Sequence, residues 1–289
     1  MMPDHYDDAQ NSPRHRANKP ALLMLGLGVL IVVVSFWFWH EVWFGRHLSE
    51  DEVGQYLSDS KSPRKIQHAL SQIADRIMQR DPSVQRWYAQ VIEAAKHEDP
   101  AIRVMAAWVM GHDHTADRFH QALLALLDDP DLRVRRNAAL SLVRFGDSSG
   151  HEEIVSMLRP ITITAPTQGR VMIDLSVGQT IGAGDLVCKI VGPDGQTIDV
   201  RTPASGKIQA VSVKDGSLTG LSDVLATIAP DQQVAWEALR GLFLIGTEED
   251  IDEIERYVLD APDVAEPVRQ QAKNTVEAIR KRSARNPTH

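Results

Sequence analysis

The chain lacks most of the features that mark an enzyme or a nucleic-acid-binding protein. It has a single cysteine, Cys188, which excludes a disulfide framework and a paired-cysteine metal or redox motif. Its net charge of −8 and pI near 5.8 do not provide the clustered positive surface that neutralises phosphates. No H-E-x-x-H, G-x-S-x-G, P-loop or G-x-G-x-x-G pattern stands at a strand-to-helix junction. We therefore expect a chain that is no enzyme, carries no cofactor, binds no nucleic acid and has protein partners.

One long apolar run lies near the N-terminus. Ala21–Trp39 contains nineteen residues without a charge, enough to cross a hydrocarbon core of about 30 Å as a helix. The run ends in Phe and Trp, as at a membrane interface, rather than in the small residues of a signal-peptide cleavage site. Basic residues precede it and acidic residues follow it. The sequence therefore predicts a single transmembrane helix over 21–43, with a cytoplasmic N-terminus and exported C-terminal domains. In a Gram-negative source these would be periplasmic domains on the bacterial inner membrane.

Amphipathic helical patterns follow from residue 62 to residue 158. Apolar residues recur at three- and four-residue spacing, as in Ile66, Leu70, Ile73 and Ile77, which indicates paired helices. Three Asp-Pro pairs, beginning at Asp81, Asp99 and Asp129, punctuate the segment. An aspartate is a good N-cap and a proline suits the first helical turn, so each pair predicts the start of a helix.

The helical pattern stops near Arg159 and resumes in the same register near Asp231. With a constant offset of 100 residues, Asp131 aligns with Asp231, and four further pairs align: Val134 with Val234, Ala138 with Ala238, Leu142 with Leu242, and Gly146 with Gly246. Two stretches in one register predict one solenoid of helix pairs, with a separate module inserted between 159 and 230.

The inserted segment consists of two similar halves at offsets of 37 to 38 residues. Pro166-Thr-Gln-Gly169 in the first half corresponds to Pro203-Ala-Ser-Gly206 in the second, and Asp185 corresponds to Asp223. Short β-branched runs separated by glycine turns predict strands. The segment is therefore expected to form an all-β domain with internal two-fold similarity.

Both parts resemble known families. Two helices resemble HEAT-like repeats of the phycobilisome-lyase type; they contain Ile102-Arg-Val-Met-Ala-Ala107 and Val134-Arg-Arg-Asn-Ala-Ala139. This resemblance implies a curved solenoid that binds other proteins. We find no residues in the sequence for the chromophore chemistry of a lyase. The inserted halves resemble the biotinyl/lipoyl domain, a barrel-sandwich hybrid of two four-stranded sheets. Carrier members of that family attach a cofactor to a lysine at a hairpin tip. Here the tip contains Gly192, Pro193, Asp194 and Gly195 and no lysine, so the resemblance points to the unmodified domain of membrane fusion proteins.

Two clusters are candidate sites. His112, His114 and His120 offer imidazoles for a metal such as zinc, although solvated loop histidines are the simpler interpretation and no metal is assigned. The second cluster is a run of carboxylates. From Asp231 to Glu266 there are eleven acidic and two basic residues, so a docking face for a basic protein is a hypothesis beside an ordinary solvated surface. The residues proposed for that face are Glu248, Glu249, Asp250, Asp252 and Glu253.

The predicted fold class is multidomain α plus β. The segments are a cytoplasmic tail (1–20), the transmembrane helix (21–43), a linker (44–61), the first repeats (62–158), the lipoyl-like sandwich (159–230), the second repeats (231–282) and a tail (283–289). The predicted function is a membrane-anchored, non-catalytic scaffold or adaptor for a membrane or periplasmic complex. The alternatives are a membrane-fusion-type subunit of a secretion or efflux system, and a lyase or cofactor carrier.

Overall fold

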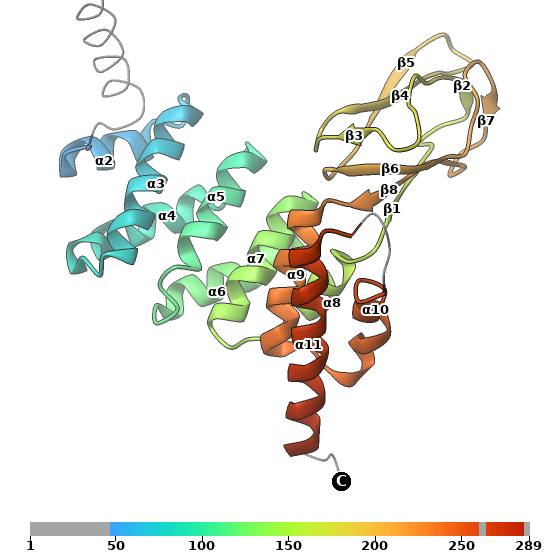
Figure 1. Ribbon diagram of the computed structural model, residues 1–289. Coiled ribbons are helices and arrows are strands. Elements are labelled where there is room, and N and C mark those ends of the chain that lie inside the picture. Colours follow the sequence, from blue (N-terminus) through green and yellow to red (C-terminus); the bar gives the residue numbers. More distant parts are fainter. Residues whose placement is uncertain (1–46, 260–263, 286–289) are drawn as a thin grey trace, which may run out of the picture. The chain divides into compact units, whose positions relative to one another are not determined.

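The computed structural model of the protein describes residues 47–259 and 264–285 (Figure 1). The chain divides into two compact units, Met1–Ser49 and Glu50–His289. The elements described below belong to the second unit, which contains a helical part and a part made of two β-sheets.

The helical part is a row of longer helices on which shorter helices pack. The longer ones are α3 (Pro63–Met78), α5 (Pro100–Met110), α7 (Leu132–Arg144), α9 (Gln232–Ile245) and α11 (Glu266–Arg285). The shorter ones are α2 (Glu50–Ser58), α4 (Tyr88–Ala94), α6 (Asp117–Ala125), α8 (His151–Ser156) and α10 (Ile251–Glu255), with 3-10 turns η2 (Pro82–Trp87), η3 (Leu126–Asp128) and η4 (Glu248–Asp250). Consecutive members of the longer set contact one another, so α3, α5, α7, α9 and α11 form one continuous row. Helix α2 lies within the segment 44–61, for which the sequence predicts a linker.

Four elements of the helical part, η2, α5, α7 and α9, begin with an aspartate cap. The side chains of Asp81, Asp99, Asp131 and Asp231 each accept a hydrogen bond from the backbone N–H two residues ahead, at 2.9, 2.9, 2.8 and 2.8 Å. The predicted start at Asp129 is displaced by two residues. The Asp129 carboxylate accepts from the Asp131 N–H at 2.8 Å and also pairs with Nε and Nη2 of Arg103, at 2.7 and 2.8 Å, but the helix begins only after Asp131. Asp131 therefore caps α7, in the same register as Asp231 caps α9.

The Asp131 cap predicts a pH-dependent contribution to stability. Hydrogen bonding from the Arg133 side chain holds the pKa of the Asp131 carboxyl below its ordinary value. A carboxyl whose pKa is lower in the folded state stabilises the fold above the unfolded-state pKa of about 3.9, and this stabilisation is lost as the pH falls through the folded-state pKa. We expect Asp131→Ala to lower the free energy of unfolding by about 1 kcal/mol at neutral pH. Urea titrations should show that difference shrinking in acid. Asp128→Ala, at an exposed position in η3, is the control and should match the wild type; an equal loss at both positions would contradict the capping role.

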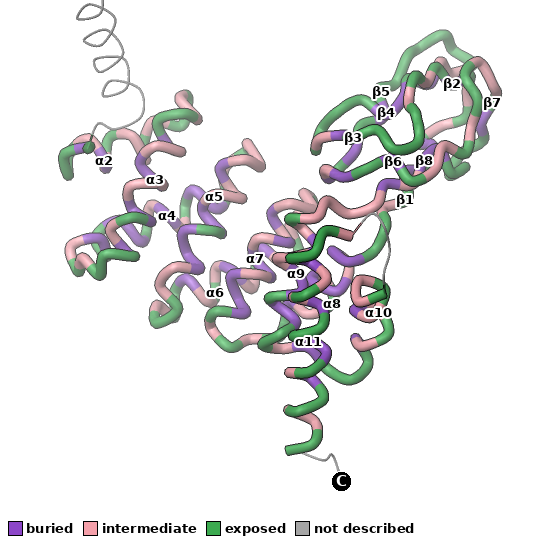
Figure 2. Tube along the Cα trace, in the orientation of Figure 1, coloured by how far each residue is buried: buried purple, intermediate pink, exposed green. Residues whose placement is uncertain are grey.

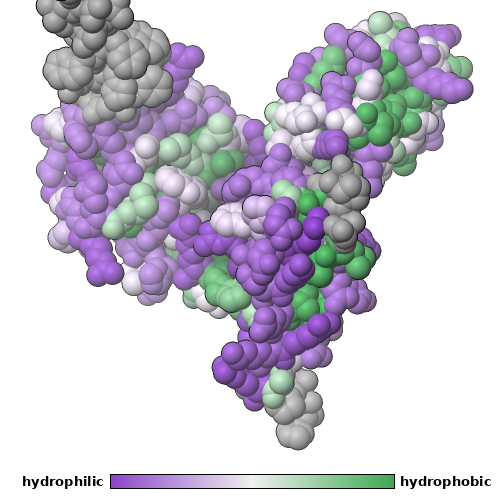
Figure 3. All heavy atoms as spheres, in the orientation of Figure 1, coloured by the Kyte–Doolittle hydropathy of each residue, from purple (hydrophilic) through white to green (hydrophobic). Residues whose placement is uncertain are grey.

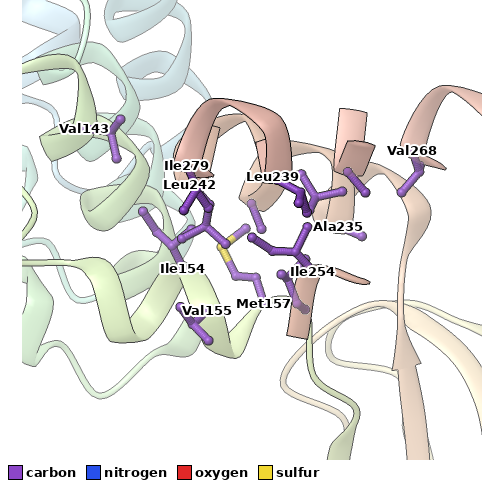
Figure 4. Packing of buried hydrophobic residues seen from close by; sticks show 14 of the residues in the cluster. Val143, Ile154, Val155, Met157, Ala235, Leu239, Leu242, Ile254, Val268 and Ile279 are labelled. Carbon is purple, nitrogen blue, oxygen red and sulfur yellow. The ribbon is translucent and has the colours of Figure 1, made fainter. Parts of the chain in front are cut away.

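The helical row continues across the inserted β segment. Helix α9 contacts both α7 and α8, which precede the insertion. One buried cluster joins Ile154 and Met157 on the N-terminal side to Leu239, Leu242 and Ile279 on the C-terminal side (Figure 4). Polar contacts reinforce this junction: the Tyr257 hydroxyl donates to the Leu158 carbonyl at 2.7 Å, and Arg159 Nε pairs with Glu253 at 3.0 Å. The two helical stretches therefore share one hydrophobic core.

The β segment forms a sandwich of two four-stranded sheets. One sheet has the order β1 (Ile161–Thr164), β8 (Val224–Pro230), β6 (Gly206–Val211), β3 (Thr180–Ile181). The other has the order β5 (Thr197–Arg201), β4 (Leu186–Val191), β2 (Gly169–Met172), β7 (Leu218–Thr219). All pairings are antiparallel, and Ile161 lies opposite Ile228. Because the first and last strands are neighbours, the segment leaves the helical row and returns to it at adjacent points.

The two halves of the sandwich repeat the same contacts. Asp185 accepts from the Gly182 N–H at 2.7 Å, and Asp223 accepts from the Gly220 N–H at 2.6 Å. A Cβ at Gly169 would lie 2.4 Å from the Val191 carbonyl oxygen, and one at Gly206 would lie 2.1 Å from the Ala229 carbonyl oxygen. Glycine is required at both places because the backbones of paired strands approach too closely for a side chain.

The sandwich has a hydrophobic core of its own. The buried sandwich cluster includes Ile163, Val171, Ile190, Ile208 and Ile228, drawn from both sheets, and no residue of a helix. Figure 2 shows buried residues along the helices and also along the strands of the sandwich. Disruption of the sandwich core is therefore expected to spare the helical core.

The predicted membrane helix and localisation are corrected at this point. A helix that crosses a bilayer needs about 20 mostly apolar residues. Among residues 47–259 and 264–285, no helix is long and apolar enough to cross a membrane; α11 has 20 residues but is rich in charge. The predicted span 21–43 lies outside the described residues. For the described residues the fold class is therefore helical repeats with a sheet region. A transmembrane helix and the assignment to a bacterial inner membrane with periplasmic domains are not supported.

Candidate protein-docking groove

A groove crosses the exposed side of α5, α7 and α9. It has a cavity volume of about 310 Å³. We call it the Trp–Arg groove, and its main lining residues are Trp108, Leu140, Arg144, Trp236, Arg240 and Leu244. Trp108 and Leu244 remain 38% and 58% exposed, although they are large apolar side chains. Such residues are normally covered in a folded protein, so their grouping marks a surface suited to contact with another molecule.

The repeat register explains why these side chains meet. Trp108, Leu140 and Arg240 each stand nine positions after their N-cap aspartates, which are Asp99, Asp131 and Asp231. Equivalent positions of stacked helices project from the same face, so the three side chains line one groove. The offset of 100 residues that aligns the buried positions of α7 and α9 also aligns Leu140 with Arg240. The register thus indicates which positions share a face, whereas the stacking of the helices brings them into one groove.

Two arginines give the groove its charge. Arg144 on α7 donates through Nη1 to the Gly111 carbonyl at 3.4 Å and lies 3.1 Å from His112 Nδ1. The Arg240 guanidinium stacks over the Trp236 ring, 4.8 Å from its centroid. Partial burial lowers the pKa of Arg144, and repulsion from Arg240 lowers it further. Within the part of the chain that the structure describes, neither arginine has an ion pair with a carboxylate.

The groove continues along α9 toward α11. Phe243, which is 40% exposed, and Leu244 line two further shallow hollows. Their other walls come from α11 and include Gln271, Asn274, Lys281, Arg282 and Arg285. Arg282 donates to the carbonyls of Phe243 and Gly246 at 2.9 and 2.7 Å, and so closes the C-terminal end of α9. Figure 3 shows one face of the molecule, on which α11 is hydrophilic.

The acidic residues proposed from the sequence do not form one free surface. Asp250 is buried and accepts from the Thr247 N–H at 2.7 Å and pairs with His151 Nε2 at 2.8 Å. Glu253 pairs with Arg159 and Arg256 at 3.0 and 2.8 Å. These two carboxylates hold η4 and α10 in place. Glu248, Glu249 and Asp252 are exposed, and none of them lines the Trp–Arg groove.

The three candidate histidines lie in different surroundings. His112 packs edge-on against Trp108 at 4.5 Å between ring centroids, beside Arg144. His120 pairs with Asp147 at 2.7 Å, and His114 is exposed. No group of three or more His, Cys, Asp or Glu side chains in the described residues could hold a metal ion. His112 and His120 therefore each have a contact of their own and do not share a site.

The hairpin tip of the sandwich lies between β4 and β5. It contains Gly192, Pro193, Asp194 and Gly195, and Gly195 has a φ of 77°, which a glycine adopts readily. The nearest lysine in sequence, Lys189, lies within β4, where it pairs with Asp199 at 3.4 Å. Lys207 lies within β6. The lysines of the two strands are thus separate from the tip.

Comparison with known proteins identifies repeats in the first part of the helical row. The family model described as HEAT repeats matches residues 51–142 and 88–166. HEAT repeats are therefore present over residues 51–166, which confirms this part of the predicted resemblance. HEAT repeats commonly mediate protein–protein interactions, so the helical row is typical of a protein-interaction scaffold. We find no match among curated proteins.

Two solved structures show limited similarity. One is the crystal structure of the Kluyveromyces lactis urea carboxylase, with 25% identity, 25% of this chain and 6% of that chain covered, and a TM-score of 0.23. The other is a single-chain, multi-domain long-chain acyl-CoA carboxylase, with 14% identity and a TM-score of 0.24. That similarity covers 49% of this chain and 16% of that chain. This chain thus spans a small fraction of either protein. At these TM-scores the similarities support no assignment of fold or function.

Proposed function

We propose that this protein is a non-catalytic scaffold whose HEAT repeats bind a protein partner in the Trp–Arg groove. The observation that carries the proposal is the grouping of exposed tryptophan, phenylalanine, leucine and arginine side chains on one face of the repeat row. Aromatic residues and arginine are enriched at protein interfaces, and they supply most of the residues whose loss weakens binding strongly. The groove has both in one place.

We further propose that the inserted sandwich is a biotinyl/lipoyl-like domain without a carrier function. Its two pseudo-symmetric four-stranded sheets support the first part of this proposal. The lysine-free tip at Gly192–Gly195 supports the second. In this view the sandwich is a second binding module held at the middle of the repeat row. No observation on the described residues favours a transport adaptor, a lyase or a cofactor carrier, and we propose none of them.

Site-specific photo-crosslinking tests the scaffold proposal. A photoreactive phenylalanine analogue at Phe243 in the full-length protein is expected to form one adduct of defined mass with another protein in the source cells. The same analogue at Arg118, which is exposed on α6, is the matched control and should form none. The proposal fails when position 243 yields no protein adduct, or when positions 118 and 243 yield the same adducts.

A further inference from the structure

The strongest unexplained feature of the molecule is a pair of neighbouring arginines with no carboxylate between them. Arg144 and Arg240 come from adjacent helices of the row and line the same cavity. Their guanidinium groups repel each other, and this repulsion contributes to the lowered pKa of Arg144. Like charges held together are unfavourable, and an anion placed between them removes that cost. The pair is therefore preorganised for a negatively charged group.

The charge of the groove contrasts with that of the whole chain. The protein has a net charge of −8, yet the three hollows are lined by Arg144, Arg240, Lys281, Arg282 and Arg285 and by a single acidic residue, Glu237. Glu237 accepts from Gln233 Nε2 at 2.8 Å, one turn earlier on α9. A local positive surface favours binding of an acidic partner at the groove. The net negative charge of the whole protein meanwhile disfavours unspecific binding of polyanions.

Apolar side chains flank the arginine pair on both sides. Trp108 and Trp236 lie in the cavity itself, and Phe243 and Leu244 follow within one turn of Arg240. An anion alone would leave these side chains exposed to water. A protein segment that carries a carboxylate and a neighbouring large apolar side chain would satisfy the arginines and cover the apolar surface at the same time.

We infer that the Trp–Arg groove binds an acidic segment of a partner protein, in which a glutamate or aspartate lies between Arg144 and Arg240 and an adjacent leucine or aromatic side chain packs on Phe243 and Leu244. This inference rests on the proposed scaffold function and adds the chemistry of the partner. Arginine suits this role because its planar guanidinium binds a carboxylate through two parallel hydrogen bonds.

Selection from a random peptide library tests the inference directly. Full-length protein is used to select twelve-residue peptides, and the enriched ones are measured by fluorescence anisotropy. We expect enrichment of Asp or Glu beside Leu, Phe or Trp. Arg240→Glu should weaken binding of the enriched peptides at least about tenfold, because it places a like charge opposite their carboxylates. Arg240→Lys keeps the positive charge but loses the planar guanidinium that makes two parallel hydrogen bonds, so it should weaken binding less. Leu244→Asp should also weaken it.

Two control variants match these changes elsewhere. Arg118→Glu makes the same charge change on α6, and Leu218→Asp places a carboxylate at the 77% exposed Leu218 of the sandwich; both should bind within about twofold of the wild type. The inference is overturned when no peptide is enriched, when the enriched peptides are neutral or basic, when Arg118→Glu weakens them as much as Arg240→Glu, or when an oligonucleotide binds more tightly than they do. A crosslink at Phe243 together with any of these results would retain the scaffold and remove the acidic partner.

Discussion

Replacing Leu242 by alanine is expected to lower the free energy of unfolding by about 2–5 kcal/mol, because it opens a cavity in a close-packed core. Leu242 on α9 is fully buried, in the cluster that also contains Ile154 of α8 and Ile279 of α11 (Figure 4). That cluster joins helices from both sides of the insertion. The loss of stability should therefore appear as a single unfolding transition that includes the helical signal from both sides. Urea titration followed by far-ultraviolet circular dichroism measures it.

Leu244→Ala is the matched control for this experiment. Leu244 lies two residues further along α9 and is 58% exposed, so its truncation should change the free energy of unfolding by less than about 0.5 kcal/mol. A second, unaffected helical transition in the Leu242→Ala variant would show that the two helical stretches unfold independently. That result would contradict a shared core.

Replacing Gly206 by alanine should destabilise the sandwich by about 3 kcal/mol. The new Cβ would lie 2.1 Å from the Ala229 carbonyl oxygen and 2.7 Å from Ile228 Cγ2, far inside van der Waals contact. Because β6 pairs with β8 at this point, the strands must separate to admit a methyl group. The pseudo-equivalent Gly169→Ala, with its Cβ 2.4 Å from the Val191 carbonyl oxygen, should act in the same direction.

Hydrogen–deuterium exchange locates the effect of the Gly206 change. Amides between 161 and 230 should exchange faster, while those of α7, α9 and α11 should keep their protection, because the sandwich core contains no helix residue. Gly54→Ala is the control: nothing lies within 4 Å of a Cβ at this helical position, so the variant should equal or exceed the wild type in stability. Faster exchange throughout the helices in Gly206→Ala would contradict a separate sandwich core.

The local features of the helical part could be predicted from the sequence because their causes are local. An aspartate at a helix start binds the N–H groups of its own first turn, so Asp99 could be identified without knowledge of the fold. Asp129 shows the limit of this reasoning. It stands before a proline and accepts a hydrogen bond from the N–H two residues ahead, like Asp99, but it also pairs with Arg103 from the preceding repeat, and the helix begins only after Asp131.

The acidic cluster shows the same limit for a candidate site. The sequence shows a high density of carboxylates around Asp250, but the partner of that side chain is His151, which lies 99 positions earlier. A buried, paired carboxylate contributes to the fold and is not available for docking. Charge density in a sequence therefore does not distinguish a free acidic face from one that is used internally.

The periodic properties of this protein could be predicted from the sequence alone: most helix starts, the buried faces, the repeat register and the paired glycines of the sandwich. Each follows from forces within a few residues or from a repeated pattern. Which exposed side chains meet depends on how the helices stack. Arg144 and Arg240 are separated in the chain by the entire inserted sandwich, and they line one groove because α9 stacks directly on α7. Stacking depends on the fit of buried surfaces between distant segments, and local sequence does not contain that information.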